Sequence, residues 1–165
     1  MEIIDKSYIY YISFLIYFLI FFLINKYLDN INCQFKKNLN DYEINILTKY
    51  LKTEYETAHE YLRNSDIYHF FIIKNNVLIS YFHIVDLDDD NNFYILYAYT
   101  NKDYRKKGYI KKLLNYSFKI CKKNNINTIY YYTKIYNNAS INTSKSLGFS
   151  VFEEKKDNIY FYKNL

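Results

Sequence analysis

The chain has 165 residues, a formal net charge of +5 and a pI near 8.9. This length predicts one globular domain, and the apolar content is ample for a hydrophobic core. Two cysteines, Cys33 and Cys121, are too few for a disulfide framework, which excludes the disulfide-stapled class of small secreted proteins. The basic balance suits an anionic ligand, an anionic membrane surface or nucleic acid.

The N-terminal stretch from 8 to 24, YIYYISFLIYFLIFFLI, carries no charge. As a helix it spans about 25 Å, and its flanks extend it toward the ~30 Å of a bilayer core. No small-x-small cleavage site follows, which argues against a signal peptide. The stretch is apolar on every face, which argues against a helix packed by one side. We predict a transmembrane anchor over residues 1–28 that contacts the membrane through residues 8–24.

The charges that flank this stretch predict its orientation. Lys6 precedes it, whereas Lys26, Lys36 and Lys37 follow it. The positive-inside rule therefore places the C-terminal domain in the cytosol, as part of a single-pass membrane protein. Residues 29–40 are polar and read as a tether, in which Cys33 is either a free thiol or a palmitoylation site.

An amphipathic pattern follows the tether. Asp41 is a helix cap, and apolar residues then recur every three or four positions, which predicts one or two helices through about Arg63. Residues 68–74 and 77–86 are β-prone and flank an Asn-Asn turn, so we predict a hairpin. The acidic run 86–92 lacks the Gly and terminal Glu of an EF-hand, which favours a solvated loop over a calcium site.

The C-terminal half alternates strands and helices. A strand at 93–99 leads to a helix at 108–124 and a strand at 128–135, and the helical crossover predicts that these two strands are parallel. Cys121 falls on the apolar side of that helix and is expected in the core. The remaining elements are a helix capped by Gly148 and a closing hairpin, predicted at 138–146, 149–155 and 159–163.

A basic turn stands between the strand at 93–99 and the helix that follows. The stretch 97–110, YAYTNKDYRKKGYI, ends a strand, turns and opens a helix. The free N–H groups and the dipole of a helix N-terminus make a site for phosphate. No Asp or Glu occurs between Asp103 and Glu153 to cancel the cations of this region. Those cations are Arg105, Lys106, Lys107, Lys111 and Lys112.

Two motifs resemble those of the GNAT family of N-acetyltransferases. The run Arg105-Lys106-Lys107-Gly108-Tyr109-Ile110 resembles the family's Arg/Gln-x-x-Gly-x-Gly/Ala motif, with Ile110 in place of a small residue. The segments 137–141, NNASI, and 146–149, SLGF, are similar to the family's N-x-x-[AS]-I and G-F signatures. The resemblance covers about residue 42 to the C-terminus.

The resemblance implies a fold and a co-substrate. The fold is α+β, with a mixed central sheet in the order β-β-β-α-β-α-β-β after one or two N-terminal helices, and the domain spans 41–165. Acetyl-CoA then lies between strands 93–99 and 128–135, with Gly108 letting the phosphate approach the backbone. The residues that this implies for cofactor binding are Tyr97, Ala98, Tyr99, Arg105, Lys106, Lys107, Gly108, Tyr109 and Ile110.

The resemblance also implies a direct acetyl transfer to an amine, which needs a base and an acid. The family's tyrosine acid aligns with Ser144, so Ser144, water or a nearby tyrosine donates the proton, or activity is low. Asn137 bonds the cofactor or caps a helix, and Ser140 is a further cofactor candidate.

The base stays unassigned at this point. By pKa alone its candidates are His59, His69 and His83.

Three functions remain open from the sequence. The leading hypothesis is a membrane-anchored, acetyl-CoA-dependent N-acetyltransferase acting on an amine of a small molecule or a protein. The alternative is a catalytically weak or inactive GNAT-fold binding module on a membrane, motivated by Ser144 and Ile110. Nucleic-acid binding through Tyr130, Tyr131 and Tyr132 is disfavoured, because no RNP-like motif accompanies them.

Overall fold

The computed structural model describes residues 6–29, 32–52, 61–87 and 92–165. The chain divides into two compact units, residues 1–32 and residues 33–165, which are treated separately below.

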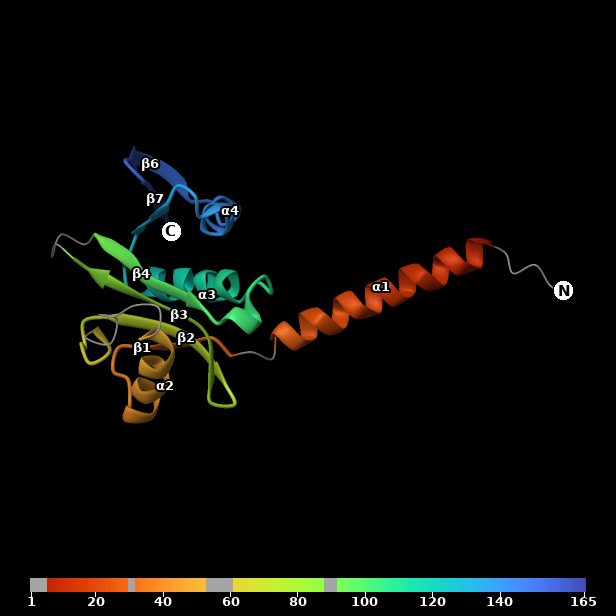
Figure 1. The fold of residues 1–165 in the computed structure, drawn as a ribbon, viewed down its shortest axis with the longest axis horizontal. Helices are drawn as coiled ribbons and strands as arrows, with labels where there is room; N and C mark the ends of the chain where they lie inside the picture. Colours follow the sequence, from red (N-terminus) through yellow and green to blue (C-terminus); the bar gives the residue numbers. More distant parts are fainter. Residues whose placement is uncertain (1–5, 30–31, 53–60, 88–91) are drawn as a thin grey trace. The chain divides into compact units, whose positions relative to one another are not determined.

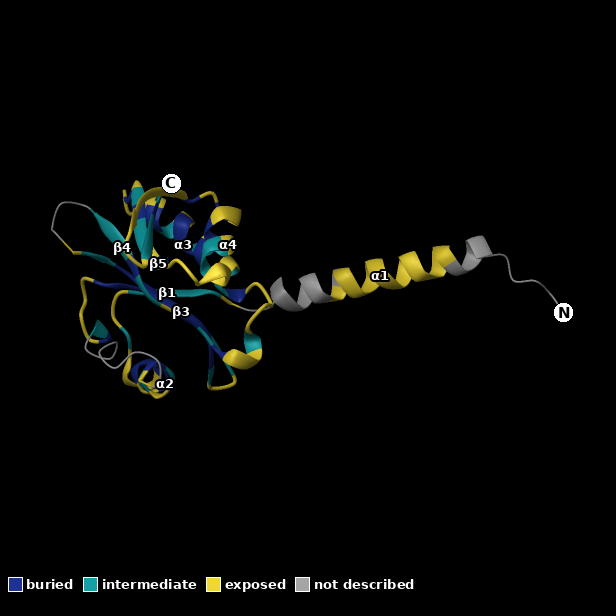
Figure 2. Cartoon of the chain, turned by 45° about the horizontal axis from the view of Figure 1, so that its top comes forward, coloured by how far each residue is buried: buried dark blue, intermediate teal, exposed yellow. Residues whose placement is uncertain are grey.

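The first unit contains one helix, α1 (Lys6–Asp29), of 24 residues. Its described side chains, at 10–21 and 23, are exposed, and the large apolar ones are between 43% and 76% accessible (Figure 2). The predicted helix is thus confirmed. Across the described part of the chain, however, no helix is long and apolar enough to span a membrane, so the predicted transmembrane anchor over residues 1–28 is not supported as a span.

The second unit is built on a seven-stranded sheet with the order β1-β2-β3-β4-β5-β7-β6 (Figure 1). Only the β4–β5 pair is parallel, which confirms the mixed α+β sheet and the crossover through α3. The strands are β1 (Gln34–Lys36), β2 (Tyr68–Lys74), β3 (Val77–Asp86), β4 (Phe93–Thr100), β5 (Thr128–Lys134), β6 (Ser150–Lys155) and β7 (Asn158–Asn164). The helices are α2 (Asp41–Leu51), α3 (Tyr109–Lys123), α4 (Asn138–Ser146) and the short 3-10 turn η2 (Lys102–Tyr104).

Strand β1 was not foreseen, because its residues were assigned to the tether at 29–40. It pairs antiparallel with β2, with Phe35 opposite Phe70. The Phe35 ring also stacks on Phe70 and Tyr68, at centroid distances of 5.2 and 5.7 Å. This aromatic contact draws the segment into the sheet, so the folded unit begins at Cys33 and not at residue 41.

The N-terminus of α2 is closed by its own side chains. Asn40, and not the predicted Asp41, is the cap: its side chain accepts from the Glu43 N–H at 2.9 Å, and the Asn40 N–H donates to the Glu43 carboxylate at 3.0 Å. This reciprocal pair is a capping box. Lys36 adds an ion pair to Glu43 at 2.7 Å. The helix ends at Leu51, and the helical residues predicted at 53–60 lie outside the described residues.

The predicted β2–β3 hairpin is confirmed, and the backbone conformation of its turn explains how two residues can connect the strands. Asn75 and Asn76 have φ angles of 51° and 61°, the left-handed conformation that a two-residue hairpin turn requires. The strands then slip by one residue between Ile72 and Ile73. The acidic loop after β3 includes residues 88–91, which lie outside the described residues, so both interpretations of that loop stay predictions.

Helices α2 and α3 cover opposite faces of the sheet. Phe71 belongs to the buried cluster with Leu47 and Leu51 of α2. The preceding residue, Phe70, meets Tyr116 of α3 with ring centroids 6.4 Å apart. Because successive strand residues point to opposite faces, β2 and β3 are buried on both sides. Cys121 is fully buried in α3, as predicted, and burial raises the pKa of its thiol to about 12.

Candidate active site

The central feature of the site is a separation of two parallel strands. β4 and β5 pair only at Phe93 with Ile129 and at Tyr94 with Tyr130. Both strands continue beyond these pairs, β4 to Thr100 and β5 to Lys134. The strands therefore part along most of their length, and the exposed backbone edges face the space between them.

A bulge in β4 lies along this separation. Tyr81 pairs with Tyr99 and His83 pairs with Leu96, so Tyr97 and Ala98 stand opposite the single residue Phe82. Tyr97 has a φ of 53°, which is uncommon for a tyrosine and marks the bulge. The bulge therefore takes Tyr97 and Ala98, the first two residues of the predicted Tyr97–Tyr99 cofactor segment, out of the regular register, whereas Tyr99 pairs with Tyr81. Ala98 is exposed and Tyr97 is half-buried.

The basic turn that follows β4 is organised by its own side chains. Asn101, which is buried, accepts from the Asp103 N–H at 3.2 Å and donates to the Leu78 carbonyl at 3.3 Å. The Arg105 guanidinium donates from Nε to the Thr100 carbonyl at 2.9 Å. Lys107 donates from Nζ to the Asp103 carbonyl at 2.9 Å and lies over the Tyr104 ring. These bonds fix the shape of the turn.

Gly108 opens α3 from this turn. It is the N-cap residue, with a φ of 78°, and as a glycine it has no side chain that could cap the helix. A Cβ built on Gly108 meets nothing within 4 Å, so the glycine is required by its backbone conformation and not by crowding inside the protein. The first turn of α3 contains no acidic residue. The positive end of the helix dipole therefore meets no acidic side chain of the helix's own first turn, and such an end favours an anion.

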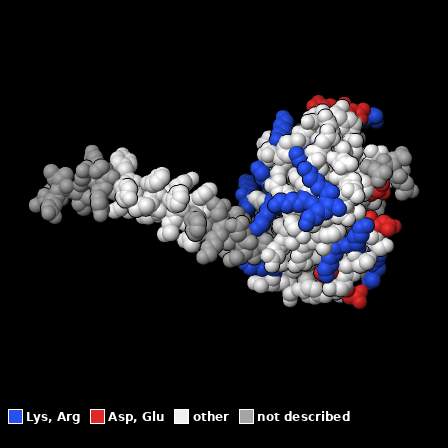
Figure 3. Space-filling model, turned by 180° about the vertical axis from the view of Figure 1, so that it is seen from behind, with Lys and Arg blue, Asp and Glu red and all other residues white. Residues whose placement is uncertain are grey.

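The neighbours of Gly108 differ in what they present. Lys106 and Lys107 are exposed, whereas the Tyr109 side chain is buried and Ile110 is half-buried. Tyr109 therefore offers only its backbone to a ligand. Figure 3 shows Lys and Arg side chains spread over the face of the unit that is seen from behind, with few acidic ones among them.

The site residues predicted at α4, which are Asn137, Ser140 and Ser144, follow β5 in the chain. The Asn137 side chain accepts from the Ser140 N–H at 3.2 Å, so it is the cap of α4, one of its two predicted roles. Ser144 is 4% exposed, and its hydroxyl donates to the Ser140 carbonyl at 2.8 Å. The hydroxyl of the predicted acid is thus already engaged within its own helix.

Tyr131 is the tyrosine of β5 that faces α4. Its ring stacks on Phe161 at 5.1 Å and meets Phe149 at 5.3 Å, on the opposite face from Tyr130 and Tyr132. Burial raises the pKa of Tyr131 to about 12, and the Ser140 side chain works in the other direction. The phenol is therefore protonated at neutral pH and able to donate a hydrogen bond.

A buried chain of titratable groups joins β2 to β3. The Tyr81 hydroxyl lies 3.0 Å from Nδ1 of His69 and 3.0 Å from Nδ1 of His83. One hydroxyl has one proton, so it donates to one imidazole and accepts from the other. The two neutral histidines therefore carry their protons on different ring nitrogens. Tyr97 joins the group, with its ring 5.2 Å from that of His83.

His69 and His83 are both fully buried, and burial favours the neutral form of each imidazole. Burial lowers the pKa of His69 to about 4. Burial, followed by the proximity of His69, lowers the pKa of His83 to about 3. Both are neutral at physiological pH. The third predicted base candidate, His59, lies outside the described residues.

The sequence did not predict the contact of Tyr81 with His69 and His83, because this contact depends on the register of β2 and β3. An unbroken hairpin around Asn75 and Asn76 would set His69 opposite Phe82. The one-residue slip between Ile72 and Ile73 sets it opposite His83 instead. The contact of the two histidines with Tyr81 therefore depends on a β-bulge that no local sequence pattern predicts.

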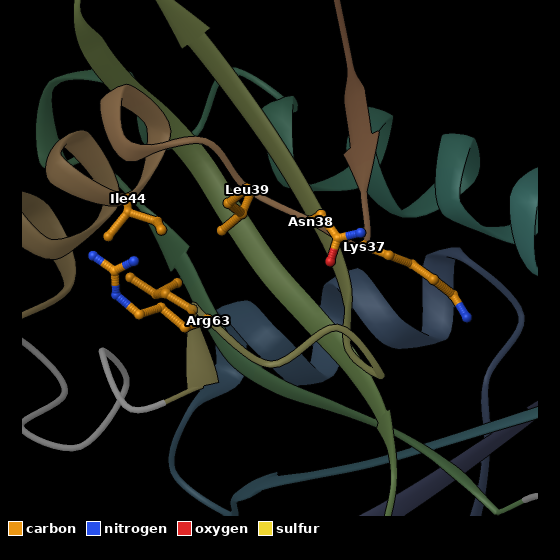
Figure 4. A pocket seen from close by; sticks show the side chains of 6 residues that line it. Lys37, Asn38, Leu39, Ile44 and Arg63 are labelled. Carbon is orange, nitrogen blue, oxygen red and sulfur yellow. The ribbon is translucent and has the colours of Figure 1, made fainter.

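A small pocket lies on the α2 side of the sheet, with a volume of about 100 Å³. Figure 4 shows Arg63 directed toward Ile44, while Lys37 points away. Ligand pockets are usually several times larger, so this one does not suit a coenzyme. Its lining consists of Lys37, Asn38, Leu39, Ile44, Leu62 and Arg63.

A mixed sheet whose parallel pair parts beside a bulge, with a helix that opens at a glycine after the bulged strand, is the α+β fold that the acetyltransferase resemblance implies. Comparison with known proteins agrees: residues 34–149 match the sequence profile described as the acetyltransferase (GNAT) family. The chain belongs to the GNAT acetyltransferase family. By its family it is accordingly an N-acetyltransferase.

Solved structures share this fold at low sequence identity. The paiA N-acetyltransferase of Thermoplasma acidophilum, in complex with coenzyme A, is 20% identical with a TM-score of 0.64, covering 82% of this chain and 100% of that one. The N-acetyltransferase PseH of Campylobacter jejuni, in complex with acetyl-coenzyme A, is 22% identical with a TM-score of 0.59, covering 81% and 98%. The ribosomal-protein-S18-alanine N-acetyltransferase of Escherichia coli is 15% identical with a TM-score of 0.66, covering 81% and 94%. No curated protein matches the chain significantly by sequence.

Proposed function

We propose that this chain binds acetyl-CoA along the separated edges of β4 and β5 and transfers the acetyl group directly to an amine. The observation that carries the proposal is the N-terminus of α3, which opens at Gly108, has no acidic residue in its first turn and adjoins Arg105, Lys106 and Lys107. A diphosphate is the ligand that such a terminus suits. The backbone of Tyr97–Tyr99, which includes the bulge at Tyr97 and Ala98, is where we place the pantetheine amides.

The reaction joins the amine nitrogen to the acetyl carbon and breaks the carbon–sulfur bond of the thioester. The amine loses a proton and the departing thiolate gains one. Ser144 is the predicted donor, but its hydroxyl has to leave the Ser140 carbonyl first. Tyr131 faces the same helix as a neutral phenol and is the tyrosine that we propose as the alternative donor. Asn137 and Ser140 are proposed to contact the cofactor from the start of α4.

A matched pair of glycines tests the cofactor site. Gly108 and Gly148 have φ angles of 78° and 75°, so alanine at either position meets the same backbone strain. We expect Gly108→Ala to weaken acetyl-CoA binding at least tenfold by isothermal titration of the full chain, because a Cβ stands where the phosphate approaches. Gly148→Ala should leave the affinity within about twofold of wild type. Equal affinities in the two variants would remove the phosphate site from α3.

One observation favours a second candidate function. The engaged Ser144 hydroxyl, together with Ile110 at a position where the family keeps a small residue, suits a catalytically weak or inactive binding module. Acetyl-CoA binding with no thiol release on a panel of small amines and N-terminal peptides would support this candidate over the enzyme.

Membrane association of α1 is a separate part of the proposal. Its support is the ring of exposed apolar side chains on the described helix and the uncharged sequence from 8 to 24. With the single-pass orientation predicted above, the acetyltransferase unit faces the cytosol, where acetyl-CoA is available. Carbonate extraction of membranes from cells that express the full chain provides the test. Complete release into the supernatant at alkaline pH would reject integral anchoring.

A further inference from the structure

The outer side of α3 carries a row of lysines, most of which the proposed mechanism does not use. The exposed residues of this helix are four lysines and Asn115, and one further lysine is half-buried beside them. The opposite side is buried against the sheet through side chains such as Leu113 and Phe118. We define the basic arc by its five lysines, which are Lys111, Lys112, Lys119, Lys122 and Lys123.

The basic arc is one continuous strip. Successive residues of an α-helix are about 100° apart, so the five lysines fall within an arc of about 120°. From Lys111 to Lys123 the strip runs about 18 Å along the helix axis. Lys119 and the lysines after it stand about 16 Å or more along that axis from Gly108, away from the proposed phosphate site. The far part of the strip is therefore left over for another partner.

No neighbouring acid neutralises this strip. The chain contains no Asp or Glu between Asp103 and Glu153, so α3 itself has none. Among the described residues, the cations that pair with carboxylates are Lys36, Arg63 and Lys155, none of which belongs to the basic arc. On β7, Lys163 lies over the ring of Phe118 at 5.4 Å and adds a further cation beside α3. Such a surface attracts an anionic partner from outside the chain.

The place where the chain enters the second unit indicates which anion this is. Burial raises the pKa of the Cys33 thiol, and the charge of Lys112 acts in the opposite direction, so Lys112 lies near Cys33. Cys33 is the first residue of the second unit. The segment that carries α1 therefore joins this unit beside the basic arc. A cluster of lysines next to a membrane-associated helix is the arrangement that attracts anionic lipid headgroups.

Nucleic acid is the other polyanion that a basic strip could bind. Proteins that bind single strands place exposed aromatic rings among their cations, on which the bases stack. The exposed residues of α3 include no aromatic ring. Lysine is also a point charge on a flexible stem, which suits a fluid layer of headgroups better than one ligand of fixed shape. Both observations favour a lipid surface.

We propose that the basic arc of α3 binds the anionic headgroups of the membrane with which α1 is proposed to associate. This inference rests on the membrane association in the proposed function and adds a second, electrostatic contact made by the acetyltransferase unit itself. The contact turns the outer side of α3 toward the lipid surface.

A matched pair of fluorescent probes tests this orientation. The full chain is added to vesicles of phosphatidylcholine, either alone or with one part in five of phosphatidylserine. A fluorophore is attached at Asn115→Cys in the basic arc or at Asn45→Cys, an exposed residue of α2 on the opposite side of the sheet. Both carry Cys33→Ser, and the remaining Cys121 is fully buried. Trace lipid with a spin-labelled headgroup quenches whichever probe approaches the surface.

We expect phosphatidylserine to increase the quenching at residue 115 at least about twofold and to leave residue 45 unchanged, since each lysine near an anionic surface strengthens attachment about fivefold. Raising the salt to about 0.5 M should remove the increase by screening. Lys119→Gln combined with Lys122→Gln should also remove most of it. Lys49→Gln combined with Lys52→Gln is the control of equal charge on α2, and it should leave the increase intact. Acetyl-CoA affinity should stay within about twofold in both double variants, because none of these lysines adjoins Gly108.

Two outcomes would overturn this inference. Equal quenching at residue 115 with and without phosphatidylserine would remove the lipid contact, and an equal loss in the two double variants would reduce it to net charge. Binding of single-stranded RNA that Lys119→Gln with Lys122→Gln abolishes, without any phosphatidylserine effect, would assign the basic arc to nucleic acid.

Pelleting of the same vesicles separates this inference from the proposal for α1. Phosphatidylcholine has no net charge, so pelleting with it alone reports the apolar helix. A chain that pellets only with phosphatidylserine and is quenched at residue 115 rejects membrane association through α1 and keeps the basic arc. A chain that pellets with both lipids but shows no phosphatidylserine effect rejects only the basic arc, and a chain that pellets with neither rejects both.

Discussion

The two halves of the sheet differ in how they are covered. In the first half, β2 and β3 are buried along most of their length between α2 and α3. In the second half, every residue of β6 is exposed. The two halves of the sheet are joined by a short parallel pairing of β4 with β5, and Phe118 of α3 also packs on Phe149 of the second half, with ring centroids 5.9 Å apart. The first half thus holds the more deeply buried strands, and the second half, with the separated edge, holds the surfaces that we propose for acetyl transfer.

The largest difference between the two halves is expected when one phenylalanine is truncated in each. Phe82 is fully buried and stacks on Phe70 at 5.2 Å, whereas Phe152 is 52% exposed. We expect Phe82→Ala to lower the free energy of unfolding by about 3–5 kcal/mol. Phe152→Ala should cost no more than about 1 kcal/mol. Urea unfolding of the full chain measures both, and similar losses would show that the second half is as much a core as the first.

The buried histidines of the first half predict an acid-sensitive fold. The folded-state pKa of His69 is about 4, below the unfolded value of 6.5, so between these values the unfolded chain binds more protons. Stability contributed by the neutral imidazole is complete above pH 6.5 and falls as pH drops toward 4. His69 alone then accounts for about 3 kcal/mol.

The comparison with a variant isolates that effect. In His69→Gln the slope of unfolding free energy against pH, measured by urea unfolding between pH 6.5 and 4.5, should be lower than in wild type by up to about 1.4 kcal/mol per pH unit. His83→Gln should behave in the same way, because burial also lowers the pKa of His83. Identical slopes in wild type and both variants would contradict the assignment.

At the junction of the halves, two hydroxyls compete for the role of proton donor. Ser144 already donates to the Ser140 carbonyl, whereas Tyr131 is a neutral phenol that faces α4. We expect Tyr131→Phe to lower kcat about tenfold or more, in the range of a lost general acid. Ser144→Ala should change kcat less than threefold by contrast. Thiol release from acetyl-CoA measures both, and the reverse ranking would return the role to Ser144.

The smallest effects concern the helix caps, one in each half. Removing the capping box with Asn40→Ala should cost about 1 kcal/mol of unfolding free energy.

Asn137 has two proposed roles, which Asn137→Ser separates because serine is an equally good cap. We expect Asn137→Ala to lose stability and acetyl-CoA affinity, and Asn137→Ser to lose only affinity, by about threefold. Unchanged affinity in both variants would leave Asn137 as a cap alone.

The sequence alone predicted several features that depend on residues close to one another in the chain. Gly108 and Gly148 mark left-handed positions, Asn75 and Asn76 mark a tight hairpin, and the apolar period locates α3. These features predicted the mixed sheet, the parallel crossover and the family, because each depends on residues within a turn or a few turns of one another. The predicted α3 and α4 boundaries agree with the structure to within one residue at each end.

Tertiary structure alone decided the features that depend on register between strands. A slip at Ile72 brings His69 opposite His83, and a bulge at Tyr97 turns the β4 backbone toward the separated edge. β1 joins the sheet only because Phe35 finds Phe70 and Tyr68 across a long stretch of chain. A one-residue shift reverses which face every side chain of a strand occupies, so pairing over such distances is settled by packing of the whole sheet and not by any local run of residues.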